Sequence, residues 1–149
     1  MSYCVLADVQ ALITGFTIDA TSTITDTQVT NEIIPLYDRY INDRLGRFYQ
    51  VPITGPNALL TMNRIEKYLV AAEVTERVYV GQAPAESLQS VTWRKLAEAD
   101  LTRLVNGDII LTDAQPTAET PEPAASQISD NLSAATRTTP PMFSMGMSF

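Results

Sequence analysis

The chain has 149 residues, of which 45% are hydrophobic, and a net charge of −7. This length suits one domain with an appendage. The acidic balance argues against a general nucleic-acid binder, and the single cysteine, Cys4, excludes an intrachain disulfide scaffold. The first 38 residues hold five acids and no Lys or Arg. This asymmetry either helps identical subunits dock or forms a solvated acidic surface.

The N-terminal stretch does not predict a signal peptide. Residues 1–16 lack a basic region and carry Asp8. No apolar run approaches the roughly 20 residues of a membrane span. We therefore expect a protein made in the cytoplasm of the producing cell, with no membrane partner.

Two helices are predicted in the first third of the chain, at 7–14 and from Thr25 to Gly46. Thr25 and Gln28 have the spacing of a capping box. Pro35 interrupts the second helix, either as a kink or as a break; the apolar stripe stays in phase across it, which favours a kink. The residues expected on the buried face are Val29, Ile33, Leu36, Tyr37, Tyr40, Ile41 and Leu45.

The second helix leads into an aromatic turn that ends at Pro52, which pushes Val51 toward extended geometry. We predict that Phe48, Tyr49, Val51 and Pro52 contact a neighbouring subunit. The alternative is that Phe48 and Tyr49 pack into the core of their own subunit.

Two long helices follow, at about 57–80, with Asn57 as its expected cap, and 85–105. Residues 109–111 form a short strand-like segment that either caps the core or pairs with a neighbouring subunit. The predicted fold is therefore all-α, a small bundle of about four helices, two of them long. The expected core of the long helices comprises Leu59, Met62, Ile65, Leu69, Ala72, Tyr79, Leu88, Val91, Trp93, Leu96, Ala97, Leu101 and Leu104.

The composition changes at residue 112. Residues 112–141 are rich in Pro, Ala, Ser and Thr and hold almost no large apolar residues, so alone they cannot bury enough surface to offset their ordering entropy. We predict a helical body, 1–111, and an extended C-terminal arm, 112–149. Met and Phe suit adaptable contacts, and the arm's predicted partner-binding residues are Met142, Phe143, Met145, Met147 and Phe149. The alternative is a terminus without a partner.

No catalytic, cofactor or metal site is predicted. The chain has no histidine, its six glycines are scattered, and it lacks a cysteine pair. A carboxylate site remains conceivable, but solvated helix faces are the favoured interpretation of Glu66, Glu73, Glu76, Glu98 and Asp100. Ion pairs with Asp38 and Asp43 are expected for Arg39, Arg44 and Arg47. We predict that the protein is not an enzyme.

The stretch 41–53, INDRLGRFYQVPI, resembles the head-to-tail connector, or head-completion adaptor, proteins of tailed bacteriophages. Asn42 and Phe48 depart from that pattern, where Asp and Arg are common, and Arg47 stands one place early. The resemblance covers roughly residues 1–111. The residues that match are Tyr3, Ile24, Thr25, Asp26, Ile41, Leu45, Tyr49 and Pro52.

The resemblance implies a structural virion protein of the neck. Such subunits form a ring, commonly of twelve copies, beneath the portal protein, and the ring extends the DNA channel toward a stopper, tail tube or nozzle. C-terminal arms in the family commonly reach the portal. DNA would pass without specific binding, because negative charge repels its phosphates.

Two other classes stay open. One is a cytoplasmic helical regulator that binds a partner protein as a monomer or dimer. The other is a carboxylate-based hydrolase, which requires two acids that converge in a pocket.

Overall fold

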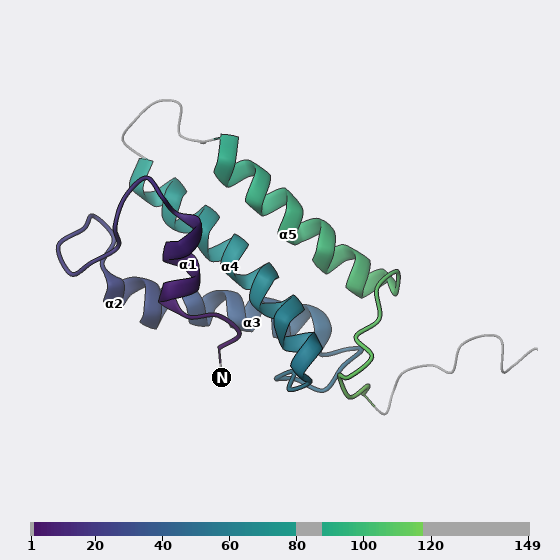
Figure 1. The fold of residues 1–149 in the computed structure, drawn as a ribbon. Helices are drawn as coiled ribbons and strands as arrows, with labels where there is room; N and C mark the ends of the chain where they lie inside the picture. Colours follow the sequence, from purple (N-terminus) through teal and green to yellow (C-terminus); the bar gives the residue numbers. More distant parts are fainter. Residues whose placement is uncertain (1, 80–87, 118–149) are drawn as a thin grey trace, which may run out of the picture. The chain divides into compact units, whose positions relative to one another are not determined.

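The computed structural model describes residues 2–79 and 88–117, and the predicted all-α fold is confirmed (Figure 1). In these residues the chain forms four helical segments. The first is α1, Leu6–Leu12, and the second joins α2 (Asp26–Gln28), the π-helical turn η1 (Val29–Ile33) and α3 (Ile34–Leu45). The long helices are α4, Pro56–Tyr79, and α5, Leu88–Asn106.

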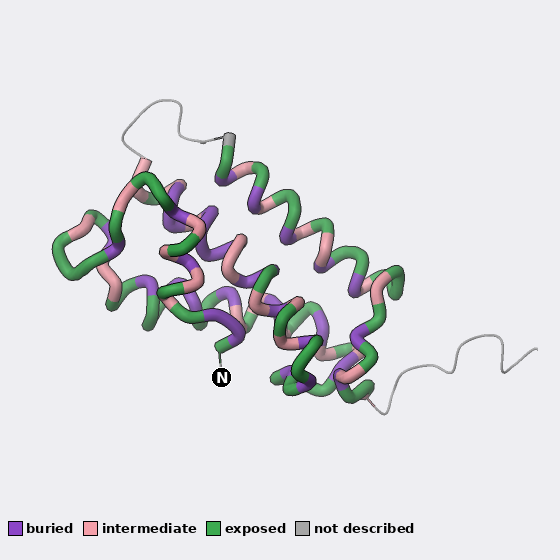
Figure 2. Tube along the Cα trace, viewed as in Figure 1, coloured by how far each residue is buried: buried purple, intermediate pink, exposed green. Residues whose placement is uncertain are grey.

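Helix α4 is the centre of the body. It lies between α5 on one side and α1 and α3 on the other (Figure 1). A helix in this position is buried on more than one face. Four consecutive residues of α4, Leu69 to Ala72, are buried, whereas buried residues follow only one side of α5 (Figure 2). The buried side chains of α4 are Ala58, Met62, Ile65, Glu66, Leu69, Val70, Ala71, Ala72, Val74 and Thr75.

The second helical segment continues through Pro35 by means of a π turn. The predicted capping box is present: Gln28 N donates to Thr25 Oγ1 at 3.3 Å, and Thr25 N donates to Gln28 Oε1 at 3.1 Å. At the end of η1, the Ile34 N–H donates to the Val29 carbonyl, five residues back. This wider turn changes the position of the preceding carbonyls, with which the proline ring would clash in a regular α-helix.

Two leucines expected in the core are exposed: Leu36 by 53% and Leu96 by 50%. Each residue of an α-helix is rotated by about 100° from the one before it. The side chain of Leu36 is thus turned away from buried Tyr37, and that of Leu96 from buried Ala97. The core of the second segment instead includes Ile34, which was not predicted.

Residues 109–111 form no strand. Leu111 is buried and completes the core, whereas Ile110 is 70% exposed. Leu111 therefore caps the core, as one of the two alternatives predicted, and pairing of this segment with a neighbouring subunit stays a prediction. The single isolated β-bridge among the described residues joins Tyr49 to Pro116, so the body continues past the predicted boundary at residue 111.

Candidate functional site

The exit turn, residues 46–53, is bound along one side by residues 111–117, which we call the anchor segment. Gln50 N donates to the Gln115 carbonyl at 2.8 Å, and Thr117 N donates to the Phe48 carbonyl at 3.1 Å. The Thr117 hydroxyl donates to the Arg47 carbonyl at 2.8 Å. The backbone of the turn is therefore fixed by residues more than 60 positions away.

The four turn residues predicted for subunit contact have different environments. Tyr49 is buried, and its hydroxyl accepts a hydrogen bond from Leu111 N at 3.2 Å, as the core alternative expected. Phe48 is half-buried against the core. Val51 and Pro52, joined by a cis peptide bond, are exposed. The subunit-contact hypothesis therefore now concerns Phe48, Val51 and Pro52.

The anchor segment also caps α4. The carboxylate of Asp113 accepts hydrogen bonds from Asn57 N at 2.6 Å and from Ala58 N at 3.0 Å. These backbone groups lack partners within the helix, and a carboxylate there also complements the helix dipole. Asn57 is the cap predicted from the sequence. Asp113 is not predicted, because a cap supplied from 56 residues away leaves no local pattern.

Tyr3 connects the N-terminal segment to the last turn of α3 and to the end of the exit turn. Its hydroxyl donates to Asn42 Oδ1 at 2.5 Å and accepts from Ile53 N at 2.9 Å. Asn42 lies in the last turn of α3, and Ile53 is the last residue of the exit turn. One buried phenol thus fixes the direction in which the chain leaves α3.

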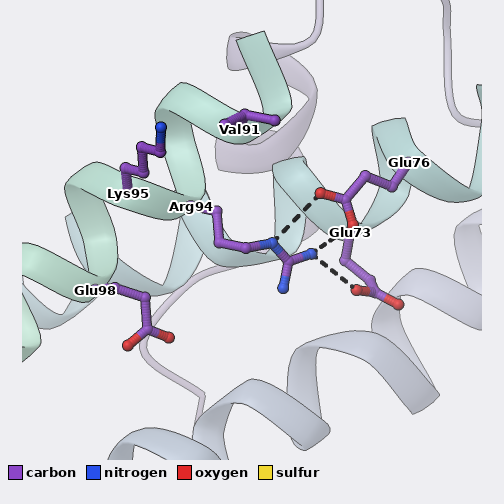
Figure 3. A pocket seen from close by; sticks show the side chains of 6 residues that line it. All are labelled: Glu73, Glu76, Val91, Arg94, Lys95 and Glu98. Atoms are coloured by element: carbon purple, nitrogen blue, oxygen red, sulfur yellow. Dashed lines mark hydrogen bonds and ion pairs between the residues drawn. The ribbon is translucent and has the colours of Figure 1, made fainter. Parts of the chain in front are cut away.

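A cavity of about 610 Å³ lies between α4 and α5. Figure 3 shows Arg94 extending from α5 to the two glutamates on α4, with 2.6 Å to Glu76 Oε2 and 3.3 Å to Glu73 Oε2. The lining residues are Glu73, Glu76, Val91, Arg94, Lys95 and Glu98.

The carboxylates of this cavity are ion-paired rather than simply solvated. Burial would raise the pKa of Glu73, but hydrogen bonds from Arg77 and Tyr37 outweigh it and lower that pKa. Burial, and then the Glu73 charge, raises the pKa of Tyr37 to about 12. At neutral pH Glu73 is therefore charged and Tyr37 protonated, so neither is suited to exchange a proton there.

Arg44 forms its ion pair across the bundle. Its guanidinium lies 3.5 Å from Glu98 on α5 and over the ring of Tyr40, whose hydroxyl donates to Glu98 at 2.7 Å. Asp38, one of the expected local partners of these arginines, instead accepts hydrogen bonds from Ser2 and from the backbone of Tyr3.

Glu66 contradicts its predicted place on a solvated face. It is fully buried, and neither carboxyl oxygen has a hydrogen-bond partner. Burial, and then the charge of Asp38, raises its pKa to about 8. The sequence held a signal for this burial, since Met62 and Leu69 place Glu66 on the apolar face at helical spacing.

The predicted arm residues Met142, Phe143, Met145, Met147 and Phe149 lie outside the described residues. Among the residues that are described, no cluster of three potential metal ligands occurs. None of the helices in this part of the chain combines the length and the apolar character needed to cross a membrane.

Comparison of the chain with models of protein families, with curated proteins and with solved structures finds no match.

Proposed function

We propose that this protein is a non-enzymatic structural subunit of a bacteriophage neck. Its body assembles into a ring, of twelve copies as is common in the connector family, between the portal protein and the next tail component. The observation that carries the proposal is the convergence of the residues that resemble that family. Tyr3 bonds to Asn42 in α3 and to Ile53 at the end of the exit turn. Ile41 and Leu45 of α3 and Tyr49 of the turn are buried.

The exit turn is the body-side contact in this proposal. Its backbone is fixed by the anchor segment, so Val51 and Pro52 are presented to a partner without a further loss of backbone entropy. Thr117, within the predicted arm 112–149, is bound to the same turn. In this proposal the turn acts on a neighbouring subunit and the arm on the portal.

The acidic composition supports passage of DNA without specific binding. Nine Lys or Arg residues lie between residues 39 and 111, and at least four of them are ion-paired within the body. A ring built from such subunits would repel DNA phosphates rather than bind them.

Electron microscopy of the full-length protein mixed with the portal tests the proposal. We expect a ring that stacks on the portal, and native mass spectrometry should give one closed ring mass. A monomer or dimer that stays unchanged when the portal is added would contradict the proposal and favour the helical regulator.

Val51→Ser tests the turn. Val51 is 39% exposed, so this variant should remain folded. The protein concentration needed for ring assembly should rise at least tenfold, which corresponds to about 1.4 kcal/mol per contact. Leu96→Ser, on the outer side of α5, is the matched control and should assemble normally. Equal assembly of both variants would remove the turn from the interface.

A further inference from the structure

The buried carboxyl of Glu66 lies beneath residues 2–5, which we call the N-terminal cover. Tyr3 and Cys4 of the cover are 6% and 2% exposed. Glu66 itself is fully buried, and neither oxygen has a hydrogen bond of good geometry, although the thiol and backbone of Cys4 lie close enough to lower its pKa. Burial in such a place favours the neutral form of a carboxyl group.

The groups around Glu66 offer no compensating positive charge. Burial, and then the charge of Asp38 on α3, raises the pKa of Glu66, whereas the Cys4 thiol and backbone of the cover lower it. The charge of Glu66 in turn acts on Tyr3. Asp8 of α1 joins the same cluster through Cys4. Asn63, three residues before Glu66 on α4, is neutral and binds both the Tyr3 carbonyl and Asp8. All the titratable neighbours are therefore acidic groups.

The cover is the non-helical segment that packs against α3 and α4. Its backbone forms no helix between residues 2 and 4, and it is attached to α3 and α4 chiefly through side chains. Ser2 and Tyr3 N donate to Asp38 at 2.5 and 3.2 Å, and Asn63 donates to the Tyr3 carbonyl at 3.0 Å. Opening the cover must also break the hydrogen bonds of the Tyr3 hydroxyl with Asn42 and with Ile53 N and expose Tyr3 and Cys4, but it need not unfold α3 or α4.

We infer that Glu66 is a proton-controlled switch for the N-terminal cover: the protonated carboxyl lets residues 2–5 close over α3 and α4, and its ionisation opens them. The closed form would then contain a neutral Glu66, and the open form an ionised, hydrated one.

The direction of the pH dependence follows from the pKa of Glu66, which is about 8 when the cover is closed and has an ordinary value of 4.5. Closing therefore binds a proton and is most favourable below the ordinary value. Between about pH 5 and pH 8 the open fraction should rise about tenfold per pH unit, and above about pH 8 it should level off.

Cys4 reports on the cover directly, because it is the only cysteine and is buried there. The experiment measures the rate at which a pyridyl disulfide reagent modifies Cys4 in the native chain, divided by the rate in urea at the same pH. This ratio removes the pH dependence of the thiol itself. It should rise about tenfold per pH unit between about pH 5 and pH 8, while the far-UV circular dichroism stays constant.

Glu66→Gln is the matched control, since it keeps the shape of the side chain but cannot ionise. Its ratio should stay flat over the same range. A flat ratio in the native protein, equal slopes in both proteins, or loss of helical signal in parallel with labelling would overturn the inference.

Should Glu66→Gln fail to fold, carboxyl ¹³C NMR of the unaltered protein can measure the titration of Glu66 and so test the switch. A Glu66 titration midpoint near 8, with amide shifts of Tyr3 and Cys4 at the same pH, supports the switch. A midpoint below about 6 contradicts it.

Discussion

Gly55 and Asp113 meet at the start of α4, where the cap can form only because glycine has no Cβ. The Asp113 carboxylate binds the first free N–H groups of the helix. A Cβ at Gly55 would overlap the Asp113 carbonyl oxygen and lie 2.6 Å from its carboxyl carbon. The absence of a side chain at residue 55 is therefore a condition for the anchor segment to reach the helix.

Gly55→Ala should destabilise the body by about 1–3 kcal/mol, since the anchor segment must move and its cap is weakened. The midpoint of urea unfolding measures this change. Gly15→Ala is the control, because a Cβ there meets only the Tyr79 hydroxyl at 3.7 Å. If the two variants unfold at the same urea concentration, the close approach at Gly55 is not required.

Among the elements, the segment from α2 to α3 shows how a proline is accommodated inside a continuous helix. Val29, Ile33, Tyr37, Ile41 and Leu45 are buried at a regular spacing of four. That spacing exceeds one α turn of 3.6 residues, and one wider π turn compensates for part of the drift. The same turn removes the clash expected at Pro35.

Pro35→Ala should therefore gain less than about 1 kcal/mol of stability. Relief of a proline in a regular helix interior would gain about 3 kcal/mol. Urea unfolding distinguishes these values, with Glu32→Ala, an exposed position on the same turn, as the control for helix propensity alone. A gain near the larger value would mean that the π turn leaves the proline strained.

At the scale of the whole molecule, the anchor segment moves the end of the body beyond the predicted boundary. Residues 111–117 supply buried Leu111, the Asp113 cap and the backbone bonds to the exit turn. Any separation of body and arm should therefore be made after Thr117 rather than after residue 111.

A chain that ends at Thr117 should keep the helical signal and the unfolding midpoint of the body. A chain that ends at Ile110 should lose roughly 3–5 kcal/mol, from the buried Leu111 side chain and the lost cap. Circular dichroism during urea unfolding measures both. If both chains are equally stable, the anchor segment contributes nothing to the body.

The same pair of chains separates folding from the proposed arm function. The chain ending at Thr117 should fold normally but fail to bind the portal, because it lacks the apolar arm residues. Normal portal binding by this chain in a pull-down would contradict the role of the arm.

The sequence by itself determined the features that depend on near neighbours. The capping box at Thr25 and Gln28, the extent of α4 and the apolar face of α5 all follow from spacings of three and four residues. Such patterns act within one or two helical turns, so they can be recognised without knowledge of the partner helix.

Only the tertiary structure decided the features that join distant parts of the chain. Tyr49 became a core residue because Leu111 N reaches its hydroxyl, and α4 is capped by Asp113 rather than by Asn57. The buried, uncompensated Glu66 likewise depends on the cover formed by residues 2–5. In each case the interaction joins groups more than 50 positions apart in the sequence, which become neighbours only after the helices have packed.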